Sequence, residues 1–272
     1  MMIETVSQVE RNDELSPGYR LLTVSFDEDV QTRSGQFAMI RPHNCMEPLL
    51  RRALAIYRSD GPRKLSFLYQ VLGRGTTALS ALRRGDLADT LVPLGNIWPV
   101  EGVASAIVVA GGIGSASVLM LCEQLARERI KTRIFFGAGS GTVAAGCGLE
   151  DFRALRLPLT LTTDDGSLGH KGLVTEPLKE YLEKGGEKDA RIYTCGPWVM
   201  MKRVAEIASE SGVECYASLE APMGCGFGVC VGCVVAVKTD GPPGYGSYKR
   251  VCIDGPVFPA EAIRWEVAAM TH

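Results

Sequence analysis

The 272-residue sequence has little histidine and little net charge. Its three histidines, His43, His170 and His272, accompany no signature of a catalytic triad or a histidine metal site. The 29 basic and 31 acidic residues give a net charge of −2, so the basic excess of a nucleic-acid-binding protein is absent. The motifs G-x-S-x-G and H-E-x-x-H and the Walker loop are also absent, which leaves hydrolase chemistry without a candidate.

A leader and a membrane span are missing as well. Glu4 stands where a secretion signal needs basic residues, and no apolar run follows it. Residues 102–122 carry no charge, but Gly111-Gly112-Ile113-Gly114 in their middle favours a strand, a turn and a helix. Nine cysteines, an odd number, fit a reducing compartment better than disulfide pairing. We therefore expect a cytoplasmic protein that binds neither nucleic acid nor membrane.

The first hundred residues consist of short segments in which apolar and polar residues alternate. Asn12-Asp13 and Ser16-Pro17-Gly18 are turn-forming and are expected to separate the first two strands. Many short strands with turns between them indicate a β-barrel, which we place at residues 1–100. We expect its strands at 6–10, 19–26, 36–40, 54–57 and 65–69, and a short helix at 76–82.

The pattern changes after Pro99. Residues 106–110 are continuously apolar, as expected of a strand buried on both faces. Thr175 is expected to cap one helix, and Pro197 to open another. Alternating strands and helices predict a parallel sheet covered on both faces, at residues 101–218, followed by a Gly- and Cys-rich region at 219–272. The other predicted elements are a helix at 116–128 and strands at 133–136, 157–162 and 191–195.

Four cysteines follow an iron–sulfur spacing. Cys225, Cys230 and Cys233 form C-x4-C-x2-C, and Cys252 follows after eighteen residues, which is the plant-type [2Fe–2S] pattern. The glycines between them let the backbone fold around a cluster and direct N–H groups at its sulfurs. Zinc is the alternative, although zinc sites favour two closely spaced cysteine pairs and here the fourth stands alone. The spacing leaves out Cys45, Cys122, Cys147 and Cys215, which we expect to be packed thiols.

Two loops at strand ends predict a dinucleotide site. Gly111-Gly112-Ile113-Gly114 lies between a buried strand and a helix, where N–H groups meet a phosphate, although helix packing alone also favours glycine. Cys195-Gly196-Pro197 follows a second strand, at the sheet edge where ligands bind. The candidate residues are Gly111, Gly112, Gly114, Gly196 and Pro197, with Cys195 as a candidate catalytic residue at the nicotinamide edge.

The first domain carries a possible pyrophosphate site. Arg51 and Arg52 begin a strand, and Gly73-Arg74-Gly75-Thr76 precedes a helix. Arginine can bind a pyrophosphate through two parallel hydrogen bonds, and helix-start N–H groups add donors. The alternative is an exposed basic patch and an ordinary helix cap. Residues 164–169 read as a turn, with a ligand role as the weaker alternative.

These motifs together resemble the ferredoxin–NADP reductase superfamily. The flavin-domain match consists of Arg52-Ala53-Leu54-Ala55-Ile56, Gly75-Thr76 and Pro93-Leu94-Gly95-Asn96. The two glycine loops resemble its nicotinamide domain. Residues 218–233 give the most specific match, and they resemble the electron-transfer subunits of NAD-dependent, two-subunit dihydroorotate dehydrogenases.

The resemblance implies cofactors, a partner and an electron route. It implies that electrons pass from FMN in a catalytic partner subunit through a [2Fe–2S] cluster and FAD to NAD+, in a heterotetramer. It also implies that this chain does not bind dihydroorotate itself, and that Cys225, Cys230, Cys233 and Cys252 hold the cluster. The implied FAD contacts are Arg52, Ala53, Leu54, Ala55, Leu68, Tyr69, Gln70, Gly75 and Thr76.

The chain departs from the family pattern at the flavin strand. The family usually has Arg-Pro-x-Ser, where this chain has Ala53 and Ala55, so one hydroxyl near the flavin is missing; Val92 replaces a frequent glycine. Two alternatives stay open: an NAD(P)H oxidoreductase with ferredoxin as partner, and a non-catalytic redox sensor. Cys225 favours the dihydroorotate reading, because some ferredoxin-linked relatives have aspartate there.

Two expectations concern the nicotinamide side. Residues 139–142 contain no arginine to meet a 2′-phosphate, which favours NAD over NADP. If Cys195 positions the nicotinamide ring, Cys195→Ala will slow hydride transfer without loss of FAD. Stopped-flow rates equal to wild type would make Cys195 a bystander.

Overall fold

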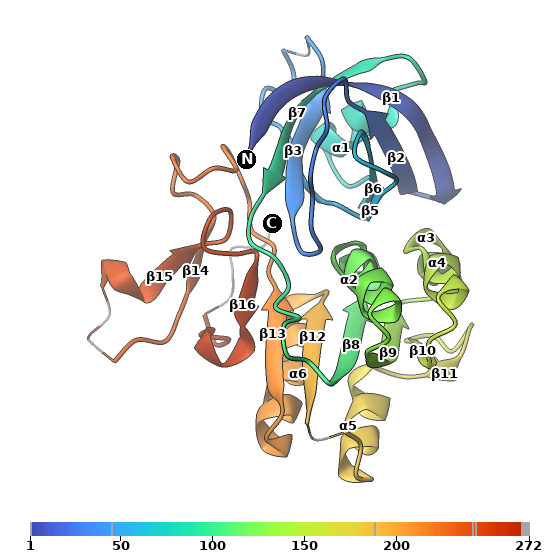
Figure 1. Ribbon diagram of the computed structural model, residues 1–272, viewed down its shortest axis with the longest axis vertical. Helices are drawn as coiled ribbons and strands as arrows, with labels where there is room; N and C mark the ends of the chain where they lie inside the picture. The colour runs from blue at the N-terminus through green and yellow to red at the C-terminus, as the bar shows by residue number, and fades with distance from the viewer. Residues whose placement is uncertain (1, 45, 188, 241, 243, 268–272) are drawn as a thin grey trace.

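The computed structural model describes residues 2–44, 46–187, 189–240, 242 and 244–267. They form two seven-stranded sheets and one two-stranded sheet (Figure 1). Cys45 and His272, mentioned above, lie outside these ranges.

The first sheet is antiparallel and curls into a half-barrel, in the order β4-β3-β7-β1-β2-β6-β5. Its inner face buries Leu22, Val24 and Phe67, and these alternating apolar residues produce the curl and the core. The short helix α1 (Arg74–Ser80) follows β6. The strands are β1 (Ile3–Ser16), β2 (Tyr19–Ser25), β3 (Phe37–Pro42), β4 (Arg52–Ala55), β5 (Arg58–Ser59), β6 (Lys64–Gln70) and β7 (Leu87–Leu94).

The turn expected at Asn12-Asp13 is wrong. Strand β1 continues through both residues, and Asn12 pairs in regular register with Leu22, between two register shifts. The Asn12 amide donates hydrogen bonds to the carbonyl oxygens of Leu79 (2.9 Å) and Leu82 (3.0 Å) at the end of α1. The side chain is therefore satisfied by a distant helix, so the backbone does not need to turn.

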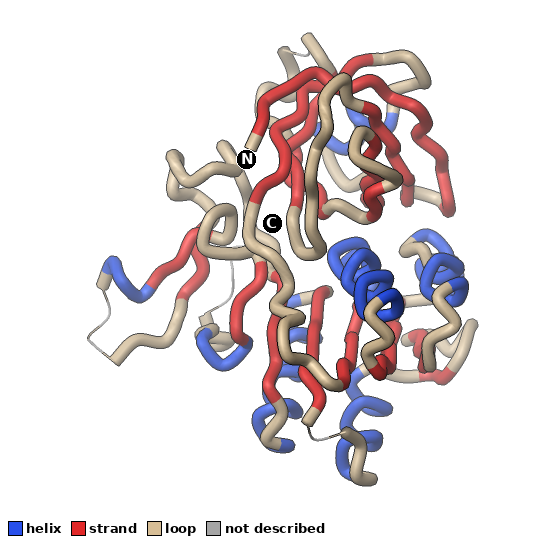
Figure 2. The backbone as a smooth tube through the Cα atoms, viewed as in Figure 1, coloured by secondary structure: helices blue, strands red, loops and turns tan. Residues whose placement is uncertain are grey.

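The second sheet has the order β11-β10-β9-β8-β12-β13-β16, parallel except for β16, and all seven residues of β8 are buried. Helices α2 (Ser115–Arg127), α3 (Gly141–Gly146) and α4 (Leu149–Ala154) cover the face with Val108. Helices α5 (Thr175–Glu183) and α6 (Trp198–Ser211) cover the face with Val109 (Figure 2). The strands are β8 (Ser105–Gly111), β9 (Lys131–Ala138), β10 (Leu159–Thr163), β11 (His170–Lys171), β12 (Ala190–Cys195), β13 (Glu214–Ser218) and β16 (Val257–Pro259).

Two expectations for this sheet have clear outcomes. The uncharged residues 102–122 divide between β8, a 3₁₀ turn and α2, and no helix of the described chain is long and apolar enough to span a bilayer. The expected Thr175 cap is wrong, because Val174 is the N-cap of α5 and Thr175 is its buried first residue. Burial of Thr175 against the sheet replaces the expected side-chain cap.

The C-terminal segment lies beside both larger sheets. It contains the small sheet of β14 (Val234–Ala236) and β15 (Tyr248–Arg250), and then returns as β16 to complete the second sheet (Figure 1). An apolar cluster joins Phe37 and Met39 of the half-barrel to Cys233 and Cys252. The predicted iron–sulfur region is therefore packed directly on the outside of the half-barrel.

Buried polar contacts fix the half-barrel on the second sheet. The Tyr57 hydroxyl donates to Asp151 (2.6 Å), and Arg58 Nε donates to Glu123 (2.8 Å). Burial, with the Asp151 hydrogen bond, raises the pKa of Tyr57, so the hydroxyl stays a neutral donor. These contacts hold the two sheets in a fixed arrangement around the space between them.

Candidate functional site

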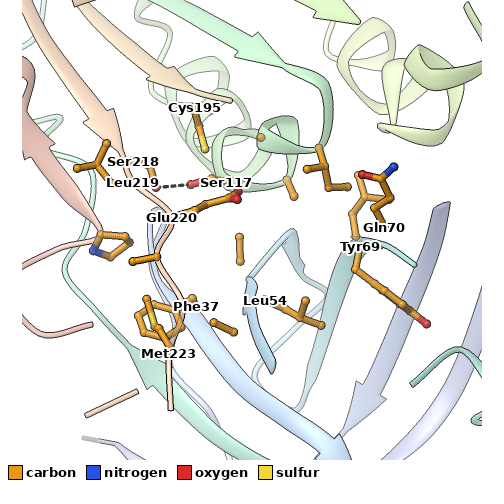
Figure 3. A pocket seen from close by; sticks show the side chains of 18 of the residues that line it. Phe37, Leu54, Tyr69, Gln70, Ser117, Cys195, Ser218, Leu219, Glu220 and Met223 are labelled. Atoms are coloured by element: carbon orange, nitrogen blue, oxygen red, sulfur yellow. Dashed lines mark hydrogen bonds between the residues drawn. The ribbon is translucent and has the colours of Figure 1, made fainter. Parts of the chain in front are cut away.

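A cavity of about 500 Å³ lies where the half-barrel, the second sheet and the C-terminal segment meet (Figure 3). Its mostly apolar walls and few polar groups are typical of a cofactor site. Strands β4 and β6 supply one wall, and the second sheet supplies the other. The predicted residues that line it are Ala53, Leu54, Ala55, Leu68, Tyr69, Gln70, Gly114 and Cys195.

The polar side chains of the cavity gather on the side of the second sheet. Ser117 Oγ donates a hydrogen bond to Ser218 Oγ (2.9 Å), and Cys195 and Glu220 lie beside this pair (Figure 3). Burial raises the pKa of Cys195, and the nearby Glu220 charge adds to this effect. Cys195 is therefore a neutral thiol in the cavity wall, suited to contact a bound ring rather than to act as a thiolate.

Glu220 is a cavity residue to which the sequence analysis gave no role. Its side chain projects into the cavity two residues after β13 ends (Figure 3). The side chain is exposed within the open cavity, but the protein around the carboxyl partly desolvates it and raises its pKa above the ordinary value. The sequence signal was an acidic residue directly after a buried strand, at the edge where ligands bind.

Arg52 and Gly75 contact each other next to the cavity, at the starts of β4 and α1. A Cβ on Gly75 would lie 1.7 Å from Arg52 Nε, so glycine makes room for the guanidinium. Arg51 points elsewhere and pairs with Glu4. The Thr76 hydroxyl accepts the N–H groups of residues 72 and 73, so it closes the turn before α1 as the helix-cap alternative proposed.

The two predicted glycine loops lie against each other. A Cβ on Gly114 would lie 2.5 Å from the Cys195 carbonyl oxygen, and one on Gly111 would lie 2.3 Å from the Met200 sulfur. Close packing thus explains both glycines without a ligand. Gly112 differs, because it has a φ of +52° and open space around it. Gly196 and Pro197 complete the contact, with Pro197 as the N-cap of α6.

Asp164 adds a carboxylate at the carboxyl edge of the second sheet. Its N–H donates to the carbonyl oxygen of Ala138 (3.0 Å), and its Oδ2 lies 4.0 Å from the place of a Cβ on Gly139. The Asp165 carboxylate accepts hydrogen bonds from the hydroxyl (2.6 Å) and the N–H (2.9 Å) of Ser167, which lower its pKa. The exposed Asp164 carboxylate has no partner among the described residues. Its sequence signal is an acidic residue directly after β10, at the carboxyl edge of the sheet.

The four predicted cluster ligands lie in two pairs. The Cys230 N–H donates to Cys225 Sγ (3.4 Å), and the Cys252 N–H donates to Cys233 Sγ (3.4 Å). Nowhere in the described ranges do three His, Cys, Asp or Glu side chains come close enough to hold one metal ion. Two thiol pairs suit two irons and do not suit a single tetrahedral zinc.

The two pairs have different environments. Burial raises the pKa of Cys225, but the N–H groups of Cys230 and Phe227 outweigh it and lower the value to about 6. Burial, together with the adjacent Cys233, raises the pKa of Cys252 to about 12. The thiolate is the metal-binding form. Backbone donors therefore prepare Cys225 to bind metal as a thiolate, while the Cys252 thiol is neutral until metal displaces its proton.

Comparison with known proteins identifies the family of this arrangement. Residues 220–264 match the model of the iron-sulfur cluster binding domain of dihydroorotate dehydrogenase B. The chain is 37% identical over 235 residues to the dihydroorotate dehydrogenase B (NAD(+)) electron transfer subunit of Desulforamulus reducens, covering 85% of this chain and 87% of that protein. It belongs to this family of electron transfer subunits. A homolog of the subunit from Aquifex aeolicus is 35% identical over 266 residues, covering 97% and 99%.

Solved structures confirm the predicted fold class. The NADH-dependent reduced ferredoxin-NADP oxidoreductase superimposes with a TM-score of 0.81 at 26% identity, covering 96% of this chain and 91% of that one. Phthalate dioxygenase reductase superimposes with a TM-score of 0.64 at 14% identity, covering 87% of each chain, and shows the fold alone. The half-barrel, the parallel sheet and the C-terminal iron–sulfur segment are thus the architecture of this family.

Proposed function

We propose that this chain is the electron transfer subunit of an NAD+-dependent dihydroorotate dehydrogenase and carries electrons from a catalytic partner to NAD+. One observation carries the proposal: a single cavity is bordered by both predicted redox neighbours. Cys195, at the nicotinamide edge, lines one side, and Pro256 lines another, four residues after the cluster ligand Cys252. The cavity is thus the meeting point that the electron route requires.

The residues around the cavity fit FAD. When bound there, FAD exchanges a hydride with NAD(H) and single electrons with a [2Fe–2S] cluster, so it belongs between the two. The apolar residues of β4 and β6 exclude water from the ring and orient it. The Arg52 guanidinium beside Gly75 would bind the pyrophosphate of FAD. The Cys195 thiol in the cavity wall would contact the nicotinamide ring of NAD.

Asp164 supports NAD over NADP. A carboxylate at the edge of the sheet can accept a hydrogen bond from the adenosine ribose hydroxyl, and it repels a 2′-phosphate. Asp164 stands beside Gly139 with its carboxylate exposed, next to the segment without arginine noted above. We infer that NADPH is rejected by this charge as well as by the missing cation.

An exposed apolar rim around the cluster segment supports a docking site for the catalytic subunit. The rim consists of Phe227, Val229, Val231 and Ile253, and Val229 is 74% exposed although it is apolar. Exposed apolar clusters of this kind mark protein contacts. We propose that an FMN-containing catalytic subunit covers the rim in a cytoplasmic heterotetramer, so that the exposed Cys230 side of the cluster faces FMN.

Reconstitution tests this function. The purified chain is expected to contain FAD, iron and acid-labile sulfide and, with a dihydroorotate dehydrogenase catalytic subunit, to reduce NAD+ on addition of dihydroorotate. The likeness to the reduced ferredoxin-NADP oxidoreductase supports a second candidate, in which ferredoxin is the partner. Turnover with ferredoxin alone would favour it. Brown protein without FAD would point to a redox sensor.

A further inference from the structure

Asn96 connects the half-barrel to the segment that leaves the cluster. Its Nδ2 donates to the carbonyl oxygens of Val257 (2.8 Å) and Asp254 (3.2 Å), and its Oδ1 accepts the Val257 N–H (2.9 Å). Its own N–H donates to the Gly255 carbonyl oxygen (2.7 Å). Asn96, two residues after β7, thus binds four backbone polar groups of a segment up to 161 positions away.

The partner of Asn96 is the linking segment, residues 252–257. It begins at the cluster ligand Cys252 and reaches Pro256, which lines the flavin cavity. Gly95 packs against the same segment, because a Cβ at this position, with φ of +76°, would lie 2.5 Å from Pro256 Cδ. The linking segment is therefore one of two short covalent paths between the cofactor sites, the other running from the cavity residue Met223 to Cys225, and Asn96 holds its cavity end.

The apolar contacts do not duplicate this function. Gly226 of the cluster loop packs on Met39, where a Cβ would lie 2.4 Å from Met39 Cγ, and Val251 lies in the shared apolar cluster. Such packing is non-directional and buries the region without fixing its position along the barrel. The four hydrogen bonds of Asn96 to Asp254, Gly255 and Val257 are directional and set that position.

We propose that Asn96 is a positioning residue for electron transfer, which fixes the cluster relative to the flavin through the linking segment. This inference rests on the function proposed above. Electron transfer between two fixed centres falls off exponentially with their separation, so displacement of the cluster away from the flavin slows it. Asn96 contacts neither cofactor and acts through residues 254–257.

The test uses the full chain loaded with FAD and cluster. NADH is mixed in a stopped-flow instrument, and two phases are followed: hydride transfer to the flavin, and then one-electron transfer to the cluster. For Asn96→Ala we expect the second phase to slow several-fold while the rate of the first stays close to that of wild type. The magnetic coupling between the reduced cluster and a paramagnetic flavin, measured by EPR, should weaken in parallel.

Two further variants separate positioning from general stability. Asn96→Ser retains one hydrogen-bonding group, so its second-phase rate should fall between those of wild type and Asn96→Ala. If Asn96→Ala loses its cluster, Asn96→Ser is the variant used for the measurement. Asn12→Ala is the matched control, because Asn12 is also half-buried and also binds two carbonyl oxygens, but inside the half-barrel. It should lower the melting temperature and leave the second phase unchanged.

The outcomes distinguish this inference from the proposed function. A second phase and EPR coupling equal to wild type in Asn96→Ala and Asn96→Ser would overturn the positioning role. Equal slowing by Asn12→Ala would also overturn it. Absence of FAD or iron from the wild-type chain would instead refute the proposed function.

Discussion

The cluster side and the nicotinamide side of the flavin cavity are built differently. On the cluster side, Asn96 binds the linking segment, and the inner thiols Cys233 and Cys252 are buried against the half-barrel. On the nicotinamide side, Gly112 borders open space and the Asp164 carboxylate is exposed. A resident cluster needs a fixed position, whereas NAD must enter and leave. One cavity thus borders a resident cluster on one side and a site for exchangeable NAD on the other.

Removal of a predicted inner cluster ligand should have the largest effect. Cys252→Ser should abolish the cluster, because the second iron then loses one of its two thiolates, while FAD stays bound. Iron and sulfide analysis with an absorption spectrum measures the loss. Cys215→Ala, which removes a buried thiol of β13 outside the cluster spacing, should keep both cofactors. Full iron content in Cys252→Ser would contradict the pairing.

The next largest effect is expected at the flavin pyrophosphate. Arg52→Ala should weaken FAD binding about 10- to 100-fold, since a hydrogen bond to a charged group contributes roughly 1.5–3 kcal/mol. Quenching of flavin fluorescence gives the dissociation constant. Arg51→Ala is the matched control, because Arg51 pairs with Glu4 away from Gly75. If both variants weakened FAD binding equally, the overall positive charge of the two arginines would account for it, and a specific contact from Arg52 would not.

A smaller effect is expected on the nicotinamide side. Asp164→Ala should raise KM for NADH about tenfold and improve the relative use of NADPH, because ribose recognition and phosphate repulsion are lost together. Diaphorase assays with both nucleotides measure the ratio. Glu183→Gln removes an exposed charge at the end of α5 and should change neither value. An unchanged NADPH-to-NADH ratio in Asp164→Ala would rule out the specificity role.

The sequence was sufficient where the chemistry is local. The predicted cluster cysteines form a local pattern because three of them fall within nine residues, and the structure places the four in two pairs. The strand, turn and helix of β8 and α2 were predictable because the apolar run and the glycines that follow it are contiguous in sequence. The walls at β4 and β6 came from family resemblance, and the structure brings these two strands together at one cavity.

The residues missed are those whose partners are remote in sequence. Asn96 meets its partner 161 positions away, and Asn12 meets the end of α1 67 positions away, so neither pairing leaves a local pattern. Asp164 had the composition of a turn, and its exposure at the sheet edge depends on the parallel pairing of β9 with β10. Tertiary contacts decide these functions, and single-sequence patterns do not encode them.

The smallest predicted effect is on stability and comes from Glu220 in the cavity wall. The Glu220 side chain is exposed in the open cavity, but partial desolvation of its carboxyl raises the folded-state pKa above the ordinary 4.5, so ionisation costs more free energy in the folded chain than in the unfolded chain. The contribution of this carboxyl to stability is therefore fully present below about pH 4.5 and is lost as pH rises through the folded-state pKa.

Glu220→Gln should remove this loss. Above the folded-state pKa its melting temperature should exceed that of wild type by at most about 2–4 °C, the shift given by 1 kcal/mol in a chain of this size, because the cavity still admits solvent. The difference should shrink as the pH falls and disappear as the pH drops below 4.5, where the carboxyl becomes neutral in both states. Thermal melts across this range measure it, with exposed Glu183→Gln as the control. A variant no more stable than wild type at pH 8 would show that the Glu220 carboxylate is well solvated, and that this wall of the cavity is as open as the nicotinamide edge.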